Sequence, residues 1–214
     1  MGLGYAETFE LNGVKIKTTV TSDENKIKNH ISSFLLPSKN HETKVIGLDA
    51  EWSLIPGTEL TFTLSKCATL QFCDGKSCLI IQLNHLGIYN HWASDSVHKS
   101  LLNFLHLPNV TFVGVGNKEN LAKLEKYYGF GCRNAVELGL LAASTMMMPR
   151  LSFCDVDELA FLVSGIDLRE HRLLTTVYDW GCDPLSRKLA KLATVNVYSY
   201  FKIGSTLLQP NVVG

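Results

Sequence analysis

The sequence predicts an α/β protein with one mixed β-sheet flanked by α-helices. Strand patterns with turns between them dominate up to residue 83, and helix and strand patterns alternate after it. Antiparallel strands followed by alternating helices and strands indicate a sheet covered on both sides. The chain has 214 residues, of which 46% are hydrophobic and 19% charged. This length and composition suit one compact core, so we assign residues 1–214 to a single domain.

The N-terminal part combines a hairpin, a helix and three strands. Residues 7–20 are typical of a β-hairpin, because Asn12-Gly13 separates two alternating runs. Residues 22–35 carry apolar side chains at helical spacing, which predicts a helix. Three further strands are predicted over residues 44–52, 66–72 and 78–83.

The C-terminal part is predicted to be mostly helical. One short apolar strand is expected over residues 110–115, and Gly129 ends the helix that follows it. Ser186 is a suitable N-cap for a long final helix over residues 186–208. The other predicted helices cover residues 97–105, 117–128, 137–147 and 156–163.

Charge and cysteine content limit the partners and the compartment. Lys and Arg together number 20, as do Asp and Glu, so the formal net charge is zero and any nucleic-acid contact should be local. The six cysteines show neither a C-x-x-C pair nor zinc-ligand spacing. We find no signal peptide and no membrane-spanning apolar run, so we expect reduced thiols, a cytoplasmic or nuclear location, and no membrane partner.

Two acids, Asp49 and Glu51, follow the apolar run at residues 45–48. Side chains alternate along a strand, so residues i and i+2 point to the same face. Two carboxylates side by side repel each other, and a cation between or beside them relieves that repulsion. Taken alone, the pattern fits either a strand end that turns into solvent or a metal site.

Three segments of the chain resemble a known family. The first is residues 45–52 (VIGLDAEW) with residues 68–72 (ATLQF), and the second is residues 112–121 (FVGVGNKENL). The third lies within residues 179–198 and contains DW, PL and KLATVNVY. In order, spacing and flanking residues they resemble the 3′–5′ exonuclease domain of the DEDD superfamily, closest to its Werner-type and RNase D-like branch. The resemblance covers about residues 7–208 and implies an RNase H-like fold.

The same resemblance implies a set of site residues. In that family four carboxylates hold two divalent ions, Mg²⁺ or Mn²⁺, and a tyrosine orients the attacking water. This chain keeps the first two acids as Asp49 and Glu51, the implied metal ligands. The family's third acid is Asn120 here, and its tyrosine and fourth acid are Leu192 and Asn196.

These substitutions predict weak or lost hydrolysis. Two carboxylates balance one divalent ion, so we expect at most one, bound weakly with help from amide oxygens and water. Residues of one catalytic unit do not contribute additively, so the joint loss should be large. Asn196 lies on the apolar stripe of the last helix, where it either hydrogen-bonds to Asp49 or Glu51 or serves as a neutral metal ligand.

Two neighbouring positions leave alternatives open. Asn120 is either an ordinary first-turn residue of a helix capped by Asn117 or a contact to metal-bound water. Glu119 replaces the missing acid only if the helix register shifts, since one residue turns a side chain through about 100°. Trp52 either stacks on a terminal base or packs into the core. Several basic residues line a nucleic-acid channel or are solvated helix faces: Lys118, Lys123, Lys126, Arg133, Arg187, Lys188 and Lys191.

Three functions follow from this pattern. The first is an exonuclease-family protein that binds single-stranded or 3′-ended nucleic acid and hydrolyses it weakly or not at all. The second is an active Mg²⁺- or Mn²⁺-dependent 3′–5′ exonuclease on DNA or RNA, whose amides tolerate the metals. The third is a non-catalytic homo-oligomeric scaffold or interaction protein that uses the fold as a surface.

Overall fold

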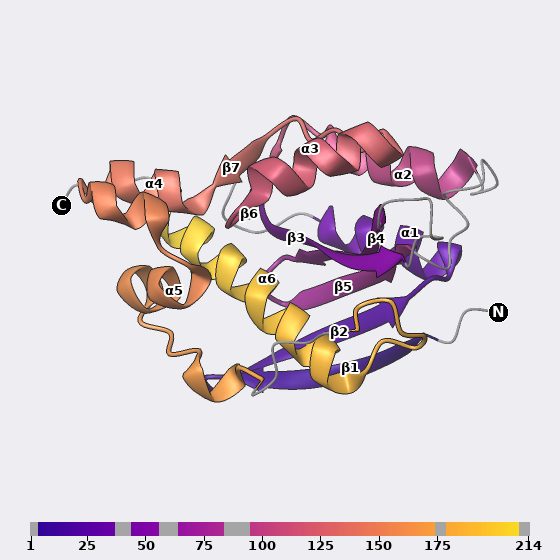
Figure 1. Cartoon of the computed structure of the whole chain (residues 1–214), viewed down its shortest axis with the longest axis horizontal. Coiled ribbons are helices and arrows are strands. Elements are labelled where there is room, and N and C mark those ends of the chain that lie inside the picture. The colour runs from indigo at the N-terminus through magenta and orange to yellow at the C-terminus, as the bar shows by residue number, and fades with distance from the viewer. Residues whose placement is uncertain (1–3, 37–43, 56–63, 84–94, 174–178, 210–214) are drawn as a thin grey trace.

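A computed structural model describes residues 4–36, 44–55, 64–83, 95–173 and 179–209. Its strands form one mixed sheet in the order β1-β2-β5-β4-β3-β6-β7, with helices on both faces (Figure 1). This architecture confirms the predicted fold class. The strands are β1 (Tyr5–Leu11), β2 (Val14–Thr21), β3 (Lys44–Ile55), β4 (Leu64–Cys73), β5 (Ser77–Gln82), β6 (Val110–Gly114) and β7 (Ala135–Glu137). The helices are α1 (Glu24–Phe34), α2 (Asp95–Leu105), α3 (Asn117–Tyr128), α4 (Leu138–Thr145), α5 (Val156–Ser164) and α6 (Arg187–Leu207), with 3-10 helices η3 (Pro149–Phe153) and η4 (Arg169–His171).

Strand β3 lies inside the sheet, antiparallel to β4 on one side and parallel to β6 on the other. It extends three residues beyond its predicted end at residue 52, to Ile55. The register with β4 shifts between Glu51 and Trp52, which marks a β-bulge. A bulge bends and twists a strand locally and is a common device next to active sites. Because Glu51 pairs with Thr69 and Trp52 with Cys67, the extra residue is Ala68 of β4, opposite the end of the acid pair.

The two faces of β3 meet different helices. One face enters the apolar core that β3 shares with α1, α2 and α3, through Ile46, Leu48 and Ala50. The other face meets α6, because a Cβ on Gly47 would lie 2.0 Å from the carbonyl oxygen of Val197. Gly47 thus permits the helix to touch the strand backbone. Asp49 and Glu51 follow Gly47 at even spacing, so the strand directs them towards α6.

Helix α6 crosses one face of the sheet and is the longest helix of the described residues (Figure 1). Ser186 caps its N-terminus as predicted, since its hydroxyl accepts a hydrogen bond from the Leu189 N–H at 3.3 Å. Farther along, the hydroxyl of Thr194 lies 2.8 Å from that of Thr18 in β2. These contacts fix the helix against the sheet. In the described parts of the chain, no helix has both the length and the hydropathy to cross a membrane.

Two local predictions need correction. The predicted helix over residues 137–147 begins one residue later, because β7 pairs with β6 through Val136 and Val113. Asn117 does not cap α3, whose N-cap is Gly116 in the left-handed conformation at φ 68°. Instead the N–H groups of Gly116 and Asn117 donate to the Glu137 carboxylate at 3.0 and 2.9 Å. A carboxylate from β7 therefore satisfies the first N–H groups of α3.

Candidate active site

Asp49 is held in a buried position between β3 and α6. Its side chain is 6% exposed and accepts two hydrogen bonds, from the Ala50 backbone N–H at 2.8 Å and from the Tyr200 hydroxyl at 3.2 Å. Burial raises the pKa of Asp49 to about 6, and these two hydrogen bonds oppose the rise. The carboxylate is thus positioned by its own strand and by the last helix.

Glu51 is partly buried beside Asp49. Burial and then the charge of Asp49 raise the pKa of Glu51 to about 8. The repulsion that the D-x-E spacing predicts is therefore present. At neutral pH, without a cation, a proton on Glu51 relieves it. A cation that binds this pair must displace the proton on Glu51.

Asn120 joins α3 to the same end of β3. Its amide nitrogen donates to the Ala50 carbonyl at 3.3 Å, and its amide oxygen accepts from the Trp52 indole N–H at 3.0 Å. The side chain thus lies next to the acid pair and is bound to neutral groups. Glu119 is exposed, so it does not replace the acid that the family has at position 120.

Trp52 packs at the edge of the core shared with α1, α2 and α3. Its ring lies 6.4 Å from the Tyr128 ring, and the ammonium of Lys123 lies 5.5 Å from its centroid. These contacts agree with the packing interpretation.

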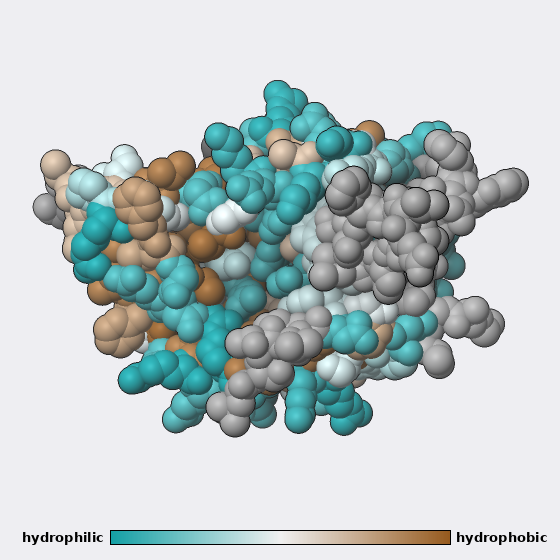
Figure 2. Space-filling view, in the orientation of Figure 1, coloured by the Kyte–Doolittle hydropathy of each residue, from teal (hydrophilic) through white to brown (hydrophobic). Residues whose placement is uncertain are grey.

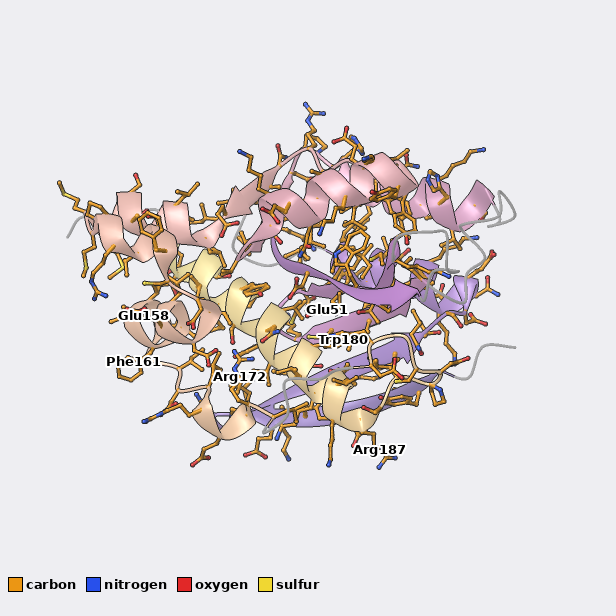
Figure 3. All side chains as sticks on the ribbon, viewed as in Figure 1. Glu51, Glu158, Phe161, Arg172, Trp180 and Arg187 are labelled. Atoms are coloured by element: carbon orange, nitrogen blue, oxygen red, sulfur yellow. The ribbon has the colours of Figure 1, made fainter. Side chains whose placement is uncertain are left out.

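Arg187, one of the basic residues of the predicted channel, pairs with Glu7 at 3.2 Å. Its side chain is 80% exposed and lies at the N-terminal end of α6 (Figure 3).

Asn196 faces a cation. Its amide oxygen accepts a hydrogen bond from Nη1 of Arg172 at 2.7 Å. Among the described residues, no hydrogen bond joins Asn196 to Asp49 or Glu51, so that interpretation stays a prediction for the amide nitrogen. The residue of α6 that bonds to Asp49 is Tyr200, one turn farther along. In the view of Figure 3, Arg172 and Glu51 lie on opposite sides of α6.

The side chain of Leu192 packs in the apolar core. It is 5% exposed, and it carries no hydroxyl at the position where the resemblance implies a tyrosine. It belongs to the apolar cluster between the N-terminal half of α6 and the sheet. The other buried members are Phe9, Val20, Ala68, Ile80, Trp180, Leu185, Leu189, Ala190 and Ala193.

Sequence reasoning missed two residues of this region. Tyr200 lies one turn after Asn196 in α6, and its hydrogen bond to Asp49 depends on how closely α6 approaches β3. Arg172 follows η4, in a stretch without helical or strand periodicity. No sequence signal distinguishes that arginine from a solvated one.

The donors present do not fit the family's pair of divalent ions. Among the described residues, no three His, Cys, Asp or Glu side chains come together as a metal site. Only Asp49 and Glu51 remain as acids. The amide oxygens of Asn120 and Asn196 already accept from N–H groups of Trp52 and Arg172. Each amide oxygen has two lone pairs, so a cation would have to share it with the N–H group that it already accepts from.

The fold is that of the RNase D-like 3′–5′ exonuclease domain. Trypanosoma brucei RNase D in complex with RNA U12 has a TM-score of 0.68 at 15% identity, over 92% of this chain and 64% of that chain. Escherichia coli RNase D has a TM-score of 0.63 at 17% identity, over 88% of this chain and 44% of that chain. The Aedes aegypti Nibbler EXO domain has a TM-score of 0.66 at 13% identity, over 94% of this chain and 91% of that chain. The chain thus spans less than two thirds of either RNase D chain.

In sequence, the chain is similar to one particular exoribonuclease. It is 26% identical over 155 residues to the Arabidopsis thaliana protein RISC-INTERACTING CLEARING 3'-5' EXORIBONUCLEASE 1, which covers 72% of this chain and 73% of that protein. No family model matches the chain. The resemblance to the RNase D-like branch is thus confirmed at the level of fold, with an exoribonuclease as a sequence relative.

Proposed function

We propose that this chain is a DEDD-type 3′–5′ exonuclease homologue that binds the 3′ end of single-stranded RNA, with weak or lost phosphodiester hydrolysis. The fold, the similarity to an exoribonuclease and the RNA-bound RNase D relative support RNA as the ligand. One observation carries the loss of activity: positions 120 and 196 hold neutral amides, whose oxygens already accept from N–H donors. The proposed location is the cytosol or the nucleus.

Asp49 and Glu51 are the proposed ligands of a single Mg²⁺ or Mn²⁺ ion. Two carboxylates balance one divalent charge, and a second ion would lack compensation. Binding should be weak, because the ion must displace the proton that the raised pKa of Glu51 favours. Titration calorimetry with Mn²⁺ should give one weak site that Asp49→Ala abolishes. Two sites, or one unchanged by Asp49→Ala, would contradict this assignment.

The decisive test measures binding and hydrolysis separately. Fluorescence anisotropy in EDTA should detect binding of a 5′-labelled oligoribonucleotide at low salt. The affinity for an oligodeoxynucleotide of equal length shows whether the chain prefers RNA to DNA. The same RNA incubated in Mn²⁺ should remain intact or shorten slowly from its 3′ end. A rapid 3′-to-5′ ladder that Asp49→Ala removes would instead establish an active exonuclease, the second function that the sequence allows. No binding to either strand would refute the proposal.

A homo-oligomeric scaffold is the alternative, favoured by one surface feature. Large apolar side chains gather over α4, η3 and α5 at one end of the molecule (Figure 2). Leu140, Met147, Phe153 and Phe161 are 62%, 88%, 90% and 61% exposed. Zero net charge removes repulsion between copies. Sedimentation equilibrium tests it: a monodisperse monomer excludes the scaffold, and an oligomer dissociated by Phe153→Asp supports it.

A further inference from the structure

Arg172 brings a permanent positive charge to α6 at the position of the family's fourth acid. Its guanidinium is held on two sides. On one side Nε donates to Asp157 of α5 at 3.0 Å, and Nη2 donates to the other oxygen of the same carboxylate. On the other side Nη1 donates to Asn196 at 2.7 Å. The fork is therefore fixed in orientation, with its side chain 26% exposed.

The charge of Arg172 is only partly compensated. Asp157 neutralises it from one side, and that side chain is 38% exposed and thus hydrated. Asn196 accepts a hydrogen bond but carries no charge. These contacts use three of the five N–H groups of the guanidinium in the described structure. Among the described residues, two N–H groups of the guanidinium remain for an anion.

Arg172 and Asp49 both contact α6. The Tyr200 hydroxyl donates to Asp49 at 3.2 Å. Asn196, which accepts from Arg172, lies one turn before Tyr200 in the same helix. The two hydrogen bonds therefore come from neighbouring turns of α6. A phosphate that approaches Asp49 and Glu51 needs positive charge nearby, and the planar fork of arginine matches phosphate geometry.

We propose that Arg172 is a phosphate-binding residue of this candidate site, holding a backbone phosphate of an RNA strand whose 3′ end lies at Asp49 and Glu51. The inference rests on the proposed RNA-binding function. Arg172 supplies part of the positive charge that the second metal ion supplies in four-carboxylate exonucleases. The neutral amide of Asn196 orients the guanidinium without cancelling its charge, which a carboxylate at this position would do.

A second ion pair of the same type provides matched controls. Arg150 donates to Glu158 at 2.8 Å, and these side chains are 58% and 46% exposed. Glu158 follows Asp157 directly in α5 (Figure 3). Gln substitutions of Arg150 and Arg172 remove the same charge. Likewise Glu158→Gln and Asp157→Asn each remove one negative charge from the same helix.

The test is anisotropy of a 5′-fluorescein oligouridylate with a free 3′-hydroxyl, in EDTA, over a series of salt concentrations. Arg172→Gln should weaken binding about tenfold. It should also lower the slope of log K against log salt by about 0.7, the value for one phosphate contact on a single strand. Asp157→Asn releases the guanidinium and should tighten binding more than Glu158→Gln does. Arg150→Gln should change neither affinity nor slope appreciably.

Each other result overturns the inference in a recognisable way. Equal weakening by Arg172→Gln and Asp157→Asn at unchanged salt slope would mean that the pair only holds α5 against α6. Wild-type affinity and slope in Arg172→Gln would remove Arg172 from the candidate site and leave RNA binding intact. No RNA binding by the wild-type chain would refute the proposed function as well. If Arg172→Gln fails to fold, the RNA affinities of Asp157→Asn and Glu158→Gln still test the inference, because only Asp157→Asn should tighten binding through Arg172.

Discussion

Asn120 and Asn196 stand at two positions where the family resemblance implies metal-binding acids, yet their surroundings differ in charge. Asn120 lies between neutral partners, the Ala50 carbonyl and the Trp52 indole. Asn196 lies against the guanidinium of Arg172. An aspartate at position 120 would thus add an uncompensated charge next to two acids, whereas one at position 196 would meet a cation. The two amides are not equivalent losses.

The difference divides the candidate site into an acidic side and a cationic side. The acidic side, where β3 faces α6, keeps Asp49 and Glu51 and their mutual repulsion. The cationic side, where α6 meets η4 and α5, carries Arg172. Restoration of a four-carboxylate metal site therefore requires removal of the arginine as well as return of the acids.

The largest effect is expected from Asn120→Asp, Asn196→Asp and Arg172→Gln combined. Each new carboxylate about 4 Å from a divalent ion contributes up to ~4 kcal/mol per unit charge at an effective dielectric near 20. Mn²⁺ affinity, measured by calorimetry, should therefore rise by about 100-fold or more. The matched control keeps Arg172 and restores both acids, and it should gain about tenfold at most. Equal gains in Mn²⁺ affinity with and without Arg172 would contradict this prediction, because the arginine would then not neutralise the new carboxylates.

The pH dependence of stability should expose the repulsion on the acidic side. Since the pKa of Glu51 is raised to about 8 in the folded state, the folded chain binds a proton at Glu51 more tightly than the unfolded chain does. The contribution of Glu51 to the stability of the metal-free protein should therefore be largest in acid. It should decline as the pH rises from the ordinary pKa of a glutamate to about 8. Glu51→Gln should remove of order 2 kcal/mol of this decline. Urea unfolding in EDTA at several pH values measures it, with the exposed Glu158→Gln as control. A parallel decline in wild type and Glu51→Gln would contradict the assignment.

Asn120→Asp alone should destabilise the metal-free protein by about 1–3 kcal/mol. The substitution replaces the donor to the Ala50 carbonyl with an acceptor and adds a third acid beside Asp49 and Glu51. Asn120→Ala loses the same hydrogen bonds without adding charge, so it should cost less. Thermal unfolding in EDTA and in Mn²⁺ compares them, and Mn²⁺ should recover the stability of Asn120→Asp only. A less stable Asn120→Ala would show that the new carboxylate finds a partner.

The acidic side could be predicted from sequence better than the cationic side. Strand periodicity and the D-x-E spacing predict that Asp49 and Glu51 share one face, and Gly47 confirms which helix that face meets. Both are local properties of one segment. Arg172 lies 24 residues before Asn196 and after an irregular stretch, so their contact depends on how α5 and η4 dock against α6. Periodicity carries no information on such a contact.

The smallest effect is expected from Asn196→Asp alone. The new carboxylate accepts from Arg172 in place of the amide oxygen, so it should stabilise the fold by about 0.5–1 kcal/mol at this partly exposed position. Mn²⁺ affinity should change by less than about threefold, because the guanidinium holds the carboxylate. RNA affinity should fall, since Arg172 is then neutralised. Chemical unfolding, calorimetry and anisotropy measure the three quantities on one variant.

A double-mutant cycle with Arg172→Gln identifies the source of that effect. In the Arg172→Gln background Asn196→Asp should destabilise, because its carboxylate then lies beside α6 without a cation. The sign of the Asn196→Asp effect thus depends on residue 172, and the interaction free energy should be about 1 kcal/mol or more. The corresponding cycle between Asn120→Asp and Arg172→Gln should be close to additive, since Asn120 is bound to β3 and not to the arginine. Equal coupling in both cycles would mean that Arg172 acts on the whole candidate site, and the two amides would then be equivalent after all.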